Sequence, residues 1–311
     1  MQTWQIVLTV IAAVIVVLVA AFFIGAFSTL NYVLGRRSTP VGFPDKYGVD
    51  KEWFDGMRGS MTELELTAYD GIKLSALLIS HGEGIKKVAI CQHGYGSSPL
   101  GMQPHAKIFY DNGFDVLLPI ARGHDGSEGK YCGLAWLDRF DVMRWVNKTV
   151  EMYGKSVEIA LLGVSMGGST VIAVAGMNPP PQVKCVIDDC GFSSQLDEYS
   201  SRIEKVKLPK RLALAPLAAG VRLACGYSIY DADITELAKN VTVPALFIHG
   251  DKDEFVPYAL GVKLYDACGS PKKSFYTAVG AEHAQAYAAD KEKYVATVVE
   301  FVDGAMQLAR Q

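Results

Sequence analysis

The chain has 311 residues, of which 50% are hydrophobic and 20% charged, and its net charge is −3. That length is enough for one large domain with a substantial core, and the charge provides no bulk attraction to nucleic acid. None of the six cysteines forms a CxxC pair, which argues against a zinc ribbon or a thioredoxin-type site. We expect mostly buried free thiols, because a domain of this size does not need disulfides.

The N-terminal segment is strongly apolar. Residues 6–27 are almost wholly hydrophobic, and no charged side chain precedes Arg36. As a helix this segment would span about 33 Å, close to the roughly 30 Å hydrocarbon core of a bilayer. A core helix normally has a polar face, and a signal peptide normally has a basic start and a shorter apolar stretch. We therefore expect residues 1–35 to form a single transmembrane anchor with its flank, with Trp4 at the interface.

Basic residues follow this anchor. Arg36, Arg37, Lys46 and Lys51 come after the apolar segment, whereas residues 1–5 contain neither Lys nor Arg. Basic residues near a span are retained on the cytoplasmic side, which predicts a cytoplasmic orientation for the rest of the chain. The charged N-terminal amine argues for the opposite orientation, so both stay open at this stage.

Residues 36–60 read as a polar juxtamembrane link, and residues 61–311 alternate between strand-like and helix-like segments. Repeated alternation of this kind predicts a mostly parallel sheet with helices on both faces. The expected strands are 61–69, 72–80, 86–94, 114–120, 157–163, 183–189, 243–250 and 272–279. The expected helices are 98–112, 135–153, 169–177, 258–268 and 286–309.

Two features modify this pattern. The first two strands flank Asp70-Gly71, a hairpin signal, so they can pair antiparallel at an edge. Residues 194–239 contain no convincing strand, and we expect a small helical cap there. The alternative is a long crossover without a role in binding, but loops of this length in compact domains are usually functional.

The strongest local motif is Gly163-Val164-Ser165-Met166-Gly167, which lies between an expected buried strand and an expected helix. It fits the G-x-S-x-G pattern, in which a sharp turn holds a serine in a strained conformation above the sheet. Glycine is required on both sides because larger side chains would collide. This context predicts that Ser165 is a nucleophile.

A nucleophilic serine needs a histidine base and a carboxylate that orients it. In this arrangement the acid and then the histidine follow the serine in the chain. Two histidines follow Ser165: His249 ends a strand, where a structural role fits better, and His283 lies in the loop before the last helix. We expect His283 to be the general base.

Several carboxylates could orient His283. Asp251, Asp253 and Glu254 lie in one loop, and Asp188 and Asp189 end an earlier strand. Asp253 is the preferred acid, and the other carboxylates are expected to cap turns.

Two backbone N–H groups are expected to bind the oxyanion. One belongs to Met166, directly after the nucleophile, and the other to Tyr95 in the glycine-containing loop after the strand 86–94. The other interpretation of this loop is an ordinary glycine-rich turn, which fits its position at a strand end less well.

These residues together resemble the α/β-hydrolase superfamily, in particular its compact bacterial branch and the eukaryotic Bem46-like proteins, often labelled serine aminopeptidase or S9/S33-like. The motifs HGYGSS, ARGHDGSEG, GVSMGGS and HGDKDEFVP, with the later GAEH, occur in the family's order over about residues 62–309. The resemblance implies that Asp253 is the acid and that Arg122-Gly123-His124 is a structural turn. Asp125 departs from the glycine that is common in the family.

The expected function is a serine hydrolase that cleaves a carboxylic ester, with an acyl or lipid-like substrate, and needs no metal or organic cofactor. Two alternatives remain: a small serine peptidase, or a catalytically inactive fold that serves as a membrane-tethered interaction module. An inactive fold typically lacks a triad member, whereas Ser165, Asp253 and His283 are all present. Partners other than a small molecule and the membrane are not predicted, and neither is the oligomeric state.

Overall fold

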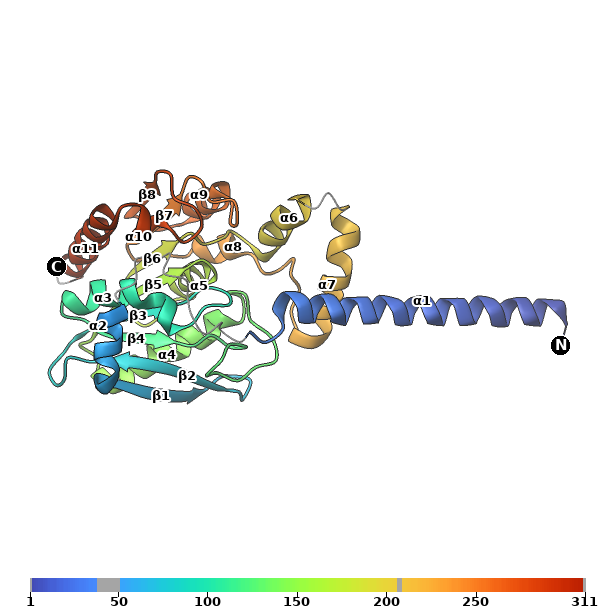
Figure 1. Ribbon diagram of the computed structural model, residues 1–311, viewed down its shortest axis with the longest axis horizontal. Helices are drawn as coiled ribbons and strands as arrows, with labels where there is room; N and C mark the ends of the chain where they lie inside the picture. The colour runs from blue at the N-terminus through green and yellow to red at the C-terminus, as the bar shows by residue number, and fades with distance from the viewer. Residues whose placement is uncertain (1, 38–50, 206–208, 310–311) are drawn as a thin grey trace.

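A computed structural model of the chain describes residues 2–37, 51–205 and 209–309 (Figure 1). Eight strands in this part form one sheet in the order β1-β2-β4-β3-β5-β6-β7-β8. β2 pairs antiparallel with β1 and with β4, and all the other neighbours are parallel. The strands are β1 (Met61–Thr67), β2 (Lys73–Ile79), β3 (Lys87–Gln92), β4 (Asp115–Pro119), β5 (Glu158–Val164), β6 (Val183–Asp189), β7 (Ala245–Gly250) and β8 (Lys273–Ala278).

The central strands are buried on both faces, which is why they read as continuous apolar runs. In β3, Val88 and Ile90 point into the core on one face of the sheet, and Ala89 and Cys91 point into the core on the other. The expected antiparallel edge is confirmed, with Gly71 in the turn at a φ of 89°.

Helices cover both faces of the sheet. One face packs against α2 (Lys51–Gly56), α3 (Gln103–Asp111) and α11 (Lys291–Leu308), which contribute Phe54, Ile108 and Val298 to its core. The other face packs against α4 (Asp138–Tyr153), α5 (Met166–Ala175) and α9 (Tyr258–Ala267), represented by side chains such as Trp145, Val171 and Leu264. Short elements complete the fold: η2 (Met57–Ser60), η3 (Pro99–Met102) and α10 (Ala286–Ala289).

Some expected boundaries differ. The segment 98–112 is a 3₁₀ turn followed by α3, and the closing segment 286–309 is two helices rather than one. Asp290 separates them because its carboxylate accepts a hydrogen bond from the N–H of Lys293 and so caps α11. Most of the expected juxtamembrane link, 38–50, lies outside the described residues, and its last part forms α2 and η2.

The N-terminal helix α1 (Thr3–Leu34) is longer than its apolar segment of 6–27. It is long and apolar enough to cross a membrane, and most of it projects from the domain (Figure 1). Its last turns are different, because Ala26, Leu30 and Leu34 are fully buried against the domain. The end of α1 is therefore part of the core of the domain.

The insertion after β6 is helical, as expected. It contains α6 (Gln195–Lys205) and α7 (Lys210–Cys225); α7 crosses the end of α1, and α6 packs against α7 (Figure 1). α8 (Ile234–Ala238) follows them and packs against α5 and α9, so it returns the chain to the sheet. The cap is thus formed mainly by α6 and α7.

Candidate active site

Ser165 lies at a sharp turn between β5 and α5, with φ 57° and ψ −118°. The two flanking glycines are required by close contacts. A Cβ on Gly163 would lie 2.1 Å from the carbonyl oxygen of Gly167, and a Cβ on Gly167 would lie 2.1 Å from that of Gln92. The local sequence therefore folds into a strained strand–turn–helix with the serine at its apex.

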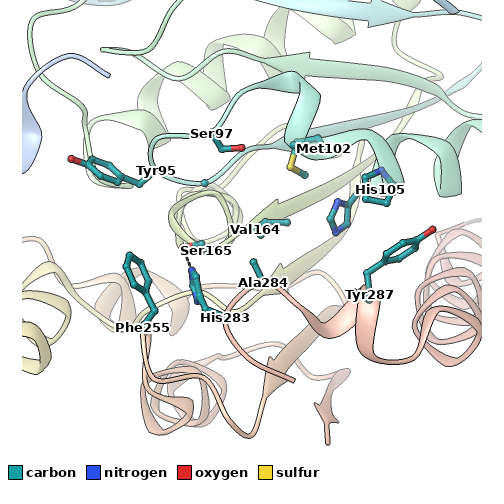
Figure 2. A pocket seen from close by; sticks show the side chains of 14 residues that line it. Tyr95, Ser97, Met102, His105, Val164, Ser165, Phe255, His283, Ala284 and Tyr287 are labelled. Atoms are coloured by element: carbon teal, nitrogen blue, oxygen red, sulfur yellow. Dashed lines mark hydrogen bonds between the residues drawn. The ribbon is translucent and has the colours of Figure 1, made fainter. Parts of the chain in front are cut away.

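His283 lies directly beside Ser165, although 118 positions separate them in the chain. The loop between β8 and α10 carries the imidazole, and its Nε2 lies 2.9 Å from Ser165 Oγ. Its Nδ1 lies 2.7 Å from Asp253 Oδ2, in the loop after β7. The three expected triad residues thus form one continuous hydrogen-bonded chain (Figure 2 shows the Ser165–His283 end).

Asp253 is held by four donors. Its Oδ1 accepts hydrogen bonds from the N–H groups of Phe255 and Val256, both at 2.9 Å, while Oδ2 faces His283 and, at 3.3 Å, Nε2 of His249. Burial alone would raise the pKa of Asp253, but the hydrogen bonds from His249 and His283 outweigh burial and lower this pKa to about 2. Asp253 is therefore ionised at neutral pH.

The second histidine on Asp253 was not expected as part of the site. His249 is fully buried, and its pKa is raised because contacts with Asp253 and the Val256 carbonyl outweigh the lowering effect of burial. Gly261 makes room for its ring, since a Cβ there would lie 2.2 Å from His249 Nδ1. In the sequence, the four-residue spacing between His249 and Asp253 was the only indication of this contact.

The other candidate acids have different partners. The Oδ1 of Asp251 accepts a hydrogen bond from the N–H of Gly280, and that of Asp188 accepts one from the N–H of Gly191. The Oδ2 of Asp189 accepts a hydrogen bond from the hydroxyl of Tyr294, and Glu254 is exposed. The three aspartates therefore support turns and packing around the site.

The loop after β3 lies against the nucleophile. A Cβ on Gly94 would be 3.2 Å from the Val164 carbonyl oxygen and 3.3 Å from Ser165 Cβ, so a larger residue here would press on the nucleophile's turn. Tyr95 follows Gly94 in this loop, and Met166 follows Ser165 as the first residue of α5. The two expected oxyanion donors, the N–H groups of Tyr95 and Met166, therefore each directly follow a residue at this contact, Gly94 and Ser165.

Two buried histidines support this loop. His93 donates through Nδ1 to the Gly94 carbonyl and accepts at Nε2 from the N–H of Ala121. His124 Nε2 accepts from the N–H of Gly96 at 2.9 Å. Burial lowers the pKa of both rings, to about 3 for His93, so both stay neutral and can accept these bonds. The expected structural role of the Arg122-Gly123-His124 turn fits these contacts.

Comparison with known proteins shows the family. The model of the family described as serine aminopeptidase, S33, matches residues 83–216 and 193–287, which together cover more than half of the chain. The chain belongs to this family and is an α/β-hydrolase of the Bem46-like branch.

Relatives and solved structures agree with this assignment. This hydrolase is 26% identical to YqkD of Bacillus subtilis over 250 residues, covering 78% of this chain and 81% of YqkD. It is 24% identical to bem46 of Schizosaccharomyces pombe over 219 residues, covering 69% and 68% of the two chains. The esterase PF2001 of Pyrococcus furiosus has the same fold, with a TM-score of 0.67, 20% identity and coverage of 86% of this chain and 96% of that one.

A cavity of about 170 Å³ opens beside Ser165 and His283 (Figure 2). Its walls come from the loop after β3, the start of α3 and the segment around α10, and they are mostly apolar. The lining side chains on the α3 and α10 sides are those of Met102, Pro104, His105, Ala284, Tyr287 and Ala288. The ring of His105 is buried, with Nε2 3.7 Å from Asp189 Oδ2, and neither nitrogen has a hydrogen-bond partner among the described residues.

The cap of this hydrolase reaches the catalytic histidine candidate through a short stack. Phe255 packs on His283 with ring centroids 4.7 Å apart, and the Arg202 guanidinium of α6 lies 4.0 Å above the Phe255 ring. Glu198, also in α6 and buried, pairs with Arg202 at 2.5 Å. The sequence placed the cap but did not predict this contact.

The end of α1 also reaches the site. The hydroxyl of Tyr95 donates to the Val33 carbonyl and accepts from Arg37 Nε, both at 2.5 Å. The main chain of Leu34 and Arg37 bonds to Cys132 and Gly123, beside the turn that carries His124. The loop next to Ser165 is thus tied to the N-terminal helix, a link that sequence reasoning did not predict.

One group of side chains in the described part of the chain has the spacing of a metal site: Cys190, Asp253 and His283. It is a poor ligand set, because Asp253 and His283 bond to each other. Burial also raises the pKa of Cys190 well above its usual value, which keeps the thiol protonated. All six cysteines are free, and five of them are buried.

Proposed function

We propose that this hydrolase is a serine esterase that cleaves a carboxylic ester through an acyl-enzyme. The observation that carries the proposal is the unbroken chain from Ser165 Oγ through His283 to Asp253, with separations of 2.9 and 2.7 Å. A base within hydrogen-bond reach of the nucleophile, itself oriented by a third group, is the arrangement that activates a serine.

In this mechanism His283 Nε2 takes the proton of Ser165 as its oxygen attacks the substrate carbonyl. Asp253 holds the Nδ1–H tautomer and stabilises the imidazolium that forms. The proton then passes from His283 to the leaving alcohol, which leaves an acyl group on Ser165. Water, deprotonated by His283, attacks this acyl-enzyme and releases the acid. No step requires a metal or an organic cofactor.

The N–H groups of Tyr95 and Met166 would bind the negative oxygen of the tetrahedral intermediate. Their preorganisation is supported by the fixed loop: Gly94 lies against Ser165, while His93 and His124 hold the backbone on either side of Tyr95. A donor that needs no rearrangement during the reaction stabilises the developing charge most effectively.

An ester substrate is favoured over a peptide by the cavity. An aminopeptidase must bind the α-ammonium group of its substrate, yet none of the described residues that line this cavity is Asp or Glu. The mostly apolar walls suit an acyl chain, and about 170 Å³ is below the roughly 300–1,000 Å³ of pockets for drug-sized ligands. The acyl group that enters this cavity is therefore short, and a longer lipid-like substituent would remain outside.

The test is a fluorophosphonate probe followed by a panel of p-nitrophenyl esters and aminoacyl p-nitroanilides. We expect stoichiometric labelling that Ser165→Ala abolishes, and turnover of short-chain esters above that of the anilides. Faster anilide turnover would favour the peptidase alternative. No labelling of the folded full chain would overturn the enzyme proposal and favour the interaction module.

We also propose that α1 is a retained membrane anchor rather than a removable signal sequence. Its last turns, with Ala26, Leu30 and Leu34, are buried in the domain, so cleavage after the apolar segment would expose core side chains. The basic pair Arg36 and Arg37 at the end of the helix supports a cytoplasmic hydrolase domain. Protease added to intact cells tests the orientation: digestion of the domain without lysis would show that it faces outward.

A further inference from the structure

Helix α7 crosses the end of α1 at a steep angle (Figure 1). The two helices are in close contact at Gly220, where a Cβ would lie 2.8 Å from the carbonyl oxygen of Ala26 and 3.1 Å from Leu30 Cβ. Ala26 and Leu30 directly follow the exposed apolar length of α1, which includes side chains from Ile6 to Ile24. If α1 spans a bilayer, α7 therefore lies at the depth where the hydrocarbon ends.

The sides of α7 have distinct environments. Leu214, Leu217 and Val221 are buried in the main core of the hydrolase domain. Gly220 faces α1, roughly a quarter turn away from those residues on a helix of 3.6 residues per turn. Since α7 crosses α1, the side opposite the domain points along α1 toward its free, N-terminal length.

That opposite side is apolar and exposed. Leu212 and Leu223 are 74% and 59% exposed, and about three helical turns separate them, so they lie on the same side of α7. Ala219 lies between them on this side and Pro216 beside it. A water-exposed strip of this kind is unfavourable, whereas insertion into the acyl boundary of a bilayer would bury both leucines.

A basic strip flanks the apolar one. Arg211 and Arg222 are exposed and also about three turns apart, each next to one of the two leucines. Lys210 at the start of α7 pairs with Glu204 of α6. Long cationic side chains beside a shallowly inserted apolar strip can reach lipid phosphates.

We propose that α7 lies in the plane of the membrane surface, with Leu212 and Leu223 in the acyl boundary and Arg211 and Arg222 on the phosphates of anionic lipids. This inference rests on the proposed anchoring by α1. The cap is then a second membrane contact, which holds the hydrolase domain, with its cavity, close to the bilayer.

The test uses the full chain in vesicles of equal parts phosphatidylcholine and phosphatidylglycerol. Cys225→Ser removes the one cysteine that is not buried, and Leu212→Cys or Leu223→Cys then carries an NBD fluorophore. Val16→Cys in α1 is the control for the lipid interior, and Val279→Cys, 79% exposed after β8, is the control for water. Emission wavelength and quenching by doxyl-labelled lipid report the depth of each probe.

We expect the probes at Leu212 and Leu223 to emit at shorter wavelength than the one at Val279 and to lose most of their emission to a shallow doxyl label. Water-like emission at both sites, with a quenched probe at Val16, would overturn the inference about α7 alone. Water-like emission at Val16 as well would overturn the anchoring too. Arg211→Gln combined with Arg222→Gln should weaken quenching at Leu223, and an unchanged signal would exclude the phosphate contacts.

Discussion

The phenol of Tyr95 donates a hydrogen bond to the main-chain carbonyl of Val33, at 2.5 Å. Tyr95 belongs to the loop beside Ser165, and Val33 to the last turn of α1. The proposed anchor and the proposed oxyanion loop are therefore coupled by a direct contact, which Arg37 reinforces from the other side of the hydroxyl.

This coupling predicts that the phenol affects catalysis as well as stability. Tyr95→Phe removes the hydrogen bonds to Val33 and Arg37, worth about 0.5–1.5 kcal/mol each. We expect kcat for a short p-nitrophenyl ester to fall several-fold with little change in KM, because the loop would be less well positioned. Tyr230→Phe, at an exposed tyrosine of the cap, is the control. Equal kcat values in both variants would show that the link does not position the loop.

Two truncations distinguish the exposed apolar part of α1, which is proposed to span the membrane, from its buried end. Removing residues 2–24 leaves Ala26, Leu30 and Leu34 in place and should give a folded, active domain. Removing residues 2–37 also deletes Arg37 and exposes the core around α7, so we expect aggregation or a large loss of activity. Solubility, circular dichroism and esterase assays distinguish the two. A fully active 2–37 deletion would show that the end of α1 is dispensable.

The acid assignment is tested by a matched pair of aspartates. Asp253→Asn should lower kcat by about 10⁴-fold, because the imidazole loses the carboxylate that holds its tautomer. Asp189→Asn should affect stability more than rate, since this side chain bonds to Tyr294 and only its main chain contacts Ser165. Rates and thermal midpoints of both variants provide the measurement. The reverse ranking of the rates would move the acid to β6.

Ser165→Ala should lower esterase turnover on the order of 10⁴-fold or more. It should leave the fold unchanged, because the flanking glycines, which allow the sharp turn at this position, are retained. Labelling by fluorophosphonate and a far-ultraviolet spectrum are the two readouts. A variant that still labels fully would remove Ser165 from the nucleophile role.

Asp188 predicts a pH dependence of stability. Burial, the largest cause, raises its pKa from 3.8 to about 7, so the folded state keeps this proton more tightly than the unfolded state does. As the pH rises from 3.8 to about 7, Asp188 ionises in the unfolded chain but stays protonated in the folded one. The unfolded state is therefore favoured, and the free energy of unfolding falls across this range. Asp188→Asn keeps the acceptor for Gly191 and should remove this part of the dependence. Urea unfolding across that range measures it, and an unchanged slope would contradict the assignment.

The sequence alone determined much of the sheet and the identity of the three residues in the hydrogen-bonded chain. Continuous apolar runs specify strands buried on both faces, and the glycines around Ser165 specify a sharp turn, because both signals are local. Chain order left His249 and His283 as candidates, and the position of His283 in the loop before the last helix selected it. Asp253 was preferred from its loop, and the family pattern agrees with that choice.

Only the tertiary structure brought His249 onto Asp253, Phe255 onto His283, Arg202 onto Phe255, and the end of α1 onto Tyr95. Each of these contacts joins two segments whose local sequences predict only a strand end, an exposed loop or an apolar span. Which surfaces meet depends on the packing of whole helices and loops against one another, and residue periodicity within a single segment carries no information about that partner.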